Sequence, residues 1–239
     1  MIERKNNYYN KLIDETLRLL IDFFGNHLLS VSSFSQTPDG LKPVLLVQID
    51  EPLINLLYDK DISPDKKEIP AFLKGKTDFT IYIITAREMA TFSENFPIEL
   101  VHIKNRYRKL YGNNDPIAQM NVDFNNLHNA VKIALQGILM HLRTAYLSQN
   151  YDDLFVVEII NRIYSIFEAA LFLRSQSIPV GLSELVFKVE SCYNQQNSIL
   201  SGIVKKIEDN DVKGIAENML ALLTTLEEIL GEVKGIVME

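Results

Sequence analysis

The sequence predicts an α+β protein, with a small mixed sheet in its first half and an up-and-down four-helix bundle in its second half. Two observations predict this class. Short apolar runs typical of strands are confined to the first half of the 239 residues. Later in the chain, apolar residues recur at helical spacing over long stretches with short connections, as in antiparallel bundles. We therefore expect a sheet domain over residues 1–118 and a helical bundle over residues 119–239.

The first half alternates helices and strands. Apolar residues on one face predict a leading helix over Glu3–Asn26, which the pair Gly25-Asn26 ends. A turn at residues 36–40 contains Pro38 and Gly40. Four apolar runs predict strands over Leu28–Phe34, Pro43–Ile49, Phe79–Thr85 and Pro97–Ile103. Between them we expect short helices over Glu51–Tyr58 and Ala86–Phe92, the latter with Thr85 as N-cap, and a polar loop over Asp59–Lys76.

The second half predicts four long helices. Their expected ranges are Asp123–Ser148, Asp153–Gln176, Ser183–Glu208 and Asp211–Lys234. The second is apolar nearly all round, which is typical of a central helix. Its thin polar stripe consists of Glu158, Asn161, Arg162, Ser165 and Glu168. The stripe is either the solvent-exposed side of this helix or a dimer contact.

Composition excludes several classes of protein. The first 112 residues carry no net charge, so the whole net charge of −7 falls on the later, helical part. An acidic bundle is poorly suited to nucleic acid, because phosphate contacts need Lys and Arg. No apolar run is long enough to span a membrane, and the start of the chain lacks a secretion signal. A single cysteine, Cys192, at an apolar helical position, fits a core residue of a cytoplasmic protein.

The common chemical motifs are absent from the sequence. The histidines His27, His102, His128 and His141 show no metal-ligand spacing, so we predict no metal site from them. Neither of the glycine-rich phosphate cradles, GxxxxGK[ST] and GxGxxG, occurs. A basic stretch remains, in which Lys104, Arg106, Arg108 and Lys109 flank Tyr107. It could bind phosphate, with Tyr107 for stacking, or form a solvated turn paired with the acidic bundle.

Several of these stretches carry a family resemblance. Phe96-Pro97-Ile98-Glu99, Arg106 and Leu110-Tyr111-Gly112 are followed by Gly137, Leu142-Arg143 and Tyr146-Leu147. In this order they resemble bacterial proteins with a nucleotidyltransferase-like fold, of the type that includes kanamycin nucleotidyltransferase, which have a helical domain after the sheet. The resemblance covers the chain to about Arg174. It implies a transferase scaffold, on which a Glu of the polar stripe could face a substrate.

The resemblance also implies a catalytic motif that this chain lacks. Active members carry Gly-Ser after the first strand, an acidic pair at the start of the second strand and a third carboxylate on a later one. The carboxylates hold two Mg²⁺ ions for phosphoryl transfer. Here the Gly-Ser positions fall on Ser35 and Gln36, and the second strand opens without an acid. The remaining candidates for metal-binding acids are Asp39, Asp50 and Glu99.

Three hypotheses about function follow from this. The leading one is a non-catalytic protein that binds a nucleotide or phosphate ligand, with Ser35, Gln36, Arg106 and Arg108 as candidates, or a helical protein partner. It needs no cofactor. The first alternative is an active nucleotidyltransferase whose rearranged acids hold Mg²⁺. The second is a structural homodimer in which the bundle packs on itself.

Overall fold

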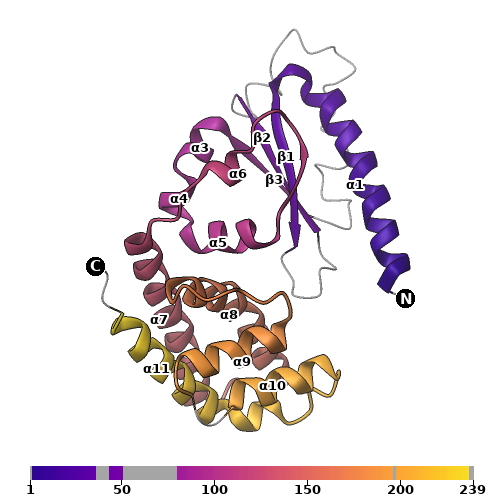
Figure 1. Cartoon of the computed structure of the whole chain (residues 1–239). Coiled ribbons are helices and arrows are strands. Elements are labelled where there is room, and N and C mark those ends of the chain that lie inside the picture. The colour runs from indigo at the N-terminus through magenta and orange to yellow at the C-terminus, as the bar shows by residue number, and fades with distance from the viewer. Residues whose placement is uncertain (1, 36–42, 51–79, 196–197, 237–239) are drawn as a thin grey trace. The chain divides into compact units, whose positions relative to one another are not determined.

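The computed structural model describes residues 2–35, 43–50, 80–195 and 198–236 (Figure 1). The turn expected at residues 36–40, the helix expected over Glu51–Tyr58 and the loop expected over Asp59–Lys76 lie outside these ranges. No helix among the described residues combines the length and the apolar character that a bilayer crossing requires.

The chain forms two compact units, which we call the sheet unit and the bundle unit. The sheet unit consists of Met1–Asn95 and Ile103–Asn121. The bundle unit consists of Phe96–His102 and Val122–Glu239. Each unit has a hydrophobic core of its own.

The sheet is mixed and four-stranded. Its strands are β1 (Leu28–Ser35), β2 (Pro43–Ile49), β3 (Thr80–Thr85) and β4 (Arg108–Tyr111), in the order β3-β2-β1-β4 (Figure 1). β1 runs antiparallel to β2 and to β4, whereas β2 and β3 are parallel. The bounds of β2 agree with the predicted strand, and those of β1 and β3 agree within one residue.

The two faces of the sheet pack against different helices. Helix α1 (Ile2–Phe24), followed by the 3₁₀ turn η1 (Gly25–His27), buries Leu20 against Val31 and Val47 on one face. On the other face lie the short helices α3 (Ala86–Ala90), α4 (Phe92–Asn95) and α6 (Pro116–Gln119). β2 supplies apolar side chains to both cores, because its side chains alternate between the faces. The predicted N-cap Thr85 is confirmed, since Thr85 and Glu88 form a reciprocal capping box.

The fourth predicted strand, Pro97–Ile103, is wrong: these residues form helix α5 (Pro97–Arg106). Pro97 occupies the first helical position, which proline favours, and Glu99 lies in the first turn with Arg106 in the last, as the helix dipole favours. Ile98 and Val101, three residues apart, are both buried in the bundle core. The fourth strand is instead β4, in the stretch expected to be a charged turn.

The first two helices of the bundle agree with the prediction. α7 (Phe124–Ser148) buries its expected face, and α8 (Asp153–Leu173) is buried on nearly all sides, so it is the central helix. Asp123 and Asp152 cap the starts of these helices. Cys192 is partly buried against the bundle core.

The third predicted helix, Ser183–Glu208, is wrong as a single helix. It is divided into α9 (Leu182–Cys192) and α10 (Ile199–Glu208). Glu190 of α9 is buried, and its carboxylate accepts hydrogen bonds from the backbone N–H groups of Leu200 (2.9 Å) and Ser201 (3.2 Å). It therefore caps α10 in place of a local N-cap, which favours a separate helix start here.

A buried tyrosine marks the end of α9. The hydroxyl of Tyr193 donates a hydrogen bond to the carbonyl of Ala170 at 2.8 Å. Burial raises the pKa of Tyr193 to about 12, so the hydroxyl stays a donor over the whole stable range of pH. The next residue, Asn194, has a positive φ of 55° and turns the chain out of the helix.

The fourth predicted helix begins later than expected. α11 runs over Met219–Lys234, and residues Ile215–Asn218 before it form a 3₁₀ turn, η3. Asp153, at the start of α8, accepts hydrogen bonds from the backbone N–H groups of Gly214 (3.0 Å) and Ala216 (2.9 Å). These bonds hold η3 against α8 and delay the start of α11.

This contact gives a pH-dependent prediction. The N–H groups of Ala216 and Gly214 lower the pKa of Asp153, so its carboxylate stabilises the fold above its ordinary pKa of about 4 and loses this contribution as the pH falls through the folded-state value. Asp153→Ala should therefore lower the melting temperature more at pH 7 than at pH 3. The exposed Asp211→Ala is the control. Equal losses at both pH values would contradict the assignment.

Candidate functional site

The candidate ligand-binding residues gather at one end of the sheet. Ser35, the last residue of β1, is paired with Pro43, and Arg108, the first residue of β4, is paired with Ser33. Arg106 ends α5 just before this strand. Ser35 and the two arginines therefore lie at the same end of neighbouring elements, which we call the Arg108 end. Gln36 lies outside the described residues.

The candidate acids do not gather there. Asp39 lies outside the described residues. Asp50 follows the last residue of β2, so it is about 23 Å along the strand from Pro43. There it lies 3.0 Å from Nδ1 of His27. Glu99 is exposed on α5, so its expected place on a fourth strand is wrong.

The described strands carry no acidic residue at all. At the start of β2, where the resemblance implies an acidic pair, Val44 is 1% exposed and Leu45 is 0% exposed. Both faces of β2 are therefore filled by apolar side chains at these positions. Among the residues that the structure describes, no group of three or more His, Cys, Asp or Glu side chains has an arrangement that could hold a metal ion.

The basic stretch has several roles rather than one. Lys104 donates hydrogen bonds to the carbonyls of Ala118 and Met120, and Lys109 donates to the carbonyl of Asn113 at 3.2 Å. These two lysines therefore stabilise the backbone segments whose carbonyl groups accept their hydrogen bonds. Arg108 is exposed, and no carboxylate of the described residues forms an ion pair with it. Its guanidinium is therefore a candidate anion-binding group at this end.

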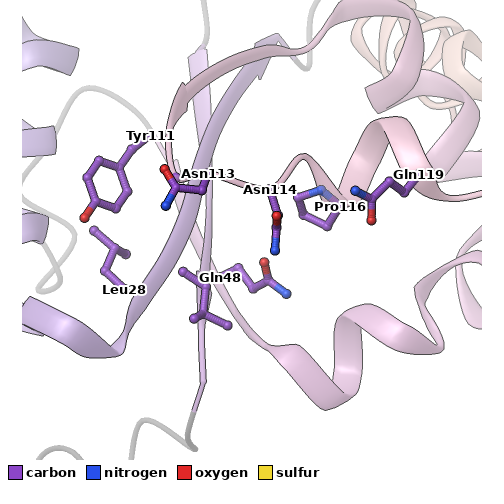
Figure 2. Close-up of a pocket in the computed structure, with 9 residues that line it drawn as sticks. Leu28, Gln48, Tyr111, Asn113, Asn114, Pro116 and Gln119 are labelled. Atoms are coloured by element: carbon purple, nitrogen blue, oxygen red, sulfur yellow. The ribbon is translucent and has the colours of Figure 1, made fainter.

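A pocket of about 660 Å³ opens at the opposite end of the same sheet. It is lined by the start of β1, the end of β2 and the link from β4 to α6. We call it the carboxamide pocket, because four of its side chains are amides: Gln48, Asn113, Asn114 and Gln119 (Figure 2). The remaining lining residues are Leu28, Leu29, Tyr111, Gly112 and Pro116. None of the nine is charged.

One wall of this pocket depends on a glycine. Gly112 has a φ of +102°, and a Cβ atom there would lie 2.4 Å from the carbonyl oxygen of Leu29 and 3.0 Å from Cα of Ser30. Only glycine allows the chain to pass so close to β1. The Leu110-Tyr111-Gly112 stretch is therefore explained by this approach, which places Asn113 and Asn114 beside the pocket.

The second wall, α6, is fixed by its own contacts. Asp115 caps the helix through the N–H of Ala118 at 3.0 Å and accepts a hydrogen bond from the hydroxyl of Tyr107 at 3.1 Å. Burial and the Asp115 carboxylate raise the pKa of Tyr107, so the phenol remains a donor. The side chain of Ile117 in this helix is buried in the core of the sheet unit. The pocket therefore has a preformed wall.

Sequence reasoning did not find the carboxamide pocket. Its residues come from three separate segments, which meet only because β4 pairs with β1. That pairing was not expected, because the basic stretch that ends at Lys109 was interpreted as a phosphate-binding stretch or a solvated turn and not as part of a strand. The available signal was the pair Asn113-Asn114 after Gly112, since Gly and Asn favour turns and binding residues are disproportionately found on loops.

The polar stripe of α8 has two different parts. Glu158 and Arg162 are exposed and form an ion pair at 2.6 Å. Glu168 is 0% exposed, so the prediction that it lies on a solvent-exposed side of α8 is wrong. Its carboxylate forms a short contact with Nδ1 of the buried His102, whose ring packs edge-on to Tyr164 at 6.0 Å. This buried pair joins α5 to α8 within the bundle unit.

Comparison with known proteins identifies the fold. No family model matches the chain, and no curated protein matches it. The chain is similar to the crystal structure of a spectinomycin adenyltransferase from Enterococcus faecialis, solved with ATP and spectinomycin. The TM-score is 0.56 at 16% sequence identity, over 93% of this chain and 99% of the other. The chain therefore has a nucleotidyltransferase-like fold, a mixed sheet followed by a helical part.

Proposed function

We propose that this chain is a non-catalytic binding protein on a nucleotidyltransferase-like fold, and that it binds a phosphate-bearing ligand such as a nucleotide at the Arg108 end of the sheet. The observation that carries the proposal is the absence of Asp and Glu from the four described strands. The similar adenyltransferase, solved with ATP, supports the choice of a nucleotide.

The charges at this end support binding without a metal ion. A phosphate can be neutralised by Mg²⁺ held on carboxylates or directly by side-chain cations. Here the start of β2 is apolar and buried, whereas β4 begins with Arg108. Arginine binds phosphate oxygens through two parallel hydrogen bonds. The position of Asp50 at the far end of β2 favours this proposal over a transferase with rearranged acids.

The experiment is a calorimetric titration with ATP in the presence of EDTA. The wild-type protein should bind ATP, and Arg108→Ala should weaken binding about 10-fold to 100-fold, because one charge-assisted bond contributes about 1.5–3 kcal/mol. Affinity should also fall as salt is raised.

The matched control is Arg87→Ala. Arg87 is an exposed arginine of α3, which follows the opposite end of β3, so its removal should leave the affinity unchanged. Failure of the wild type to bind ATP, or equal affinities of the two variants, would contradict the proposal.

A further inference from the structure

The carboxamide pocket is a second concave site, separate from the Arg108 end. Its volume of about 660 Å³ falls within the usual range for small-molecule pockets. On β1 its residue Leu29 is six residues, about 20 Å, from Ser35, and on β4 its residue Tyr111 is three residues, about 10 Å, from Arg108. We therefore expect a free base in the pocket to bind without contacting Arg108.

The side chain of Gln48 is oriented by a partly buried hydrogen bond. The hydroxyl of Ser30, which is 3% exposed, donates to Oε1 of Gln48 at 3.0 Å. The carbonyl of this amide is thus engaged, and its NH₂ group remains as a donor toward the pocket. Figure 2 shows the Gln48 amide near Asn114, with Asn113 and Gln119 at the same opening. The pocket therefore presents one oriented donor beside further amides.

The chemistry of this lining selects a class of ligand. An amide side chain carries a donor and an acceptor side by side, which match a neighbouring acceptor and donor on the edge of a nucleobase. The lining offers no charged group that would attract an ion. Tyr111, Leu28 and Pro116 add apolar surface for a flat ring.

We infer that the carboxamide pocket binds an uncharged nucleobase-like heterocycle, with Gln48 as a hydrogen-bond donor to it and Asn114 as a further contact. This site is distinct from the phosphate site proposed above, and neither depends on the other.

The experiment uses the full chain and free adenine and uracil, which carry no phosphate. Side-chain NH₂ groups give their own signals in a ¹⁵N–¹H spectrum, so binding beside them can be observed directly. At least one of the two bases should shift the NH₂ signals of Gln48 and Asn114 in a saturable manner. The NH₂ signal of Gln136, an exposed amide on α7, should not move. If neither base shifts the Gln48 signal, the inference is wrong. It is also wrong if glucose, added by itself, shifts this signal.

Two variants test the assignment of the donor. Gln48→Glu keeps an oxygen for Ser30 but replaces the donor NH₂, and it should weaken binding of the base at least tenfold. Asn114→Ala leaves the Ser30 bond intact and should weaken binding severalfold. Gln136→Ala, which removes an exposed amide of α7, is the matched control and should not change the affinity for the base. Wild-type affinity in both Gln48→Glu and Asn114→Ala would overturn the inference, even if ATP binds at the Arg108 end.

Discussion

Replacing Gly112 by alanine is expected to destabilise the sheet unit by about 3–5 kcal/mol. The added Cβ would lie 2.4 Å from the carbonyl oxygen of Leu29 and 3.0 Å from Cα of Ser30, both backbone atoms of β1. Ser30 is paired with Gln48 of β2, so its Cα cannot move without disturbing the ladder between β1 and β2. The φ of +102° adds strain for any residue with a side chain. Hydrogen exchange of the β1 and β4 amides measures the loss within the sheet unit.

The matched control is Gly137→Ala. Gly137 lies in the interior of α7, and a Cβ there would meet no atom within 4 Å. Since alanine is the better helix former by about 1 kcal/mol, this variant should be neutral or more stable than the wild type. If Gly112→Ala were as stable as Gly137→Ala, the close approach of β4 to β1 would be wrong.

The second large effect is expected from Glu168→Ala in the bundle unit. Removing one partner of a buried hydrogen bond costs about 1–3 kcal/mol, because the other partner is left unsatisfied in an apolar surrounding. Glu168 is 0% exposed, and its partner His102 is 7% exposed. Thermal unfolding followed by helical circular dichroism should show a clear fall in melting temperature.

Glu158→Ala is the control for this change. Glu158 is paired with Arg162 on the same helix, but both side chains are at least half exposed. An exposed pair at this spacing contributes only a few tenths of a kcal/mol. Melting temperatures that fall equally in both variants would show that the His102–Glu168 contact contributes no more to stability than an exposed pair does.

The sequence predicts correctly those elements whose own residue pattern is enough to determine their structure. β2 is apolar except for Gln48, because it is covered by α1 on one face and by α3 and α6 on the other. α7 and α8 were predicted with nearly correct bounds because their apolar residues recur at helical spacing and an aspartate caps each start. In these cases the residue pattern and the packing agree.

The failures have a common physical cause, which is competition from distant contacts. The run from Pro97 to Ile103 suits either a strand or a helix, and its packing with the bundle decides for a helix. α9 and α10 follow one continuous apolar pattern, but the carboxylate of Glu190 caps the second helix across the break. The buried Glu168 could not be placed without His102, which is 66 residues away in sequence.

The candidate site was only partly predictable. The sequence suggested Ser35, Arg106 and Arg108 as candidates, and the structure places them at one end of the sheet. It could not predict the carboxamide pocket, because a three-dimensional pairing of β1 with β4 assembles that site.

We propose that this sheet binds phosphate with side-chain cations, since its described strands carry no carboxylate that could hold Mg²⁺. The most direct measurement is the affinity for ATP in EDTA compared with that in excess Mg²⁺. We expect binding in EDTA, with an affinity that stays level or falls when Mg²⁺ is added, since the ion competes with Arg108 for the phosphates. Binding that occurs only with Mg²⁺ would contradict the claim.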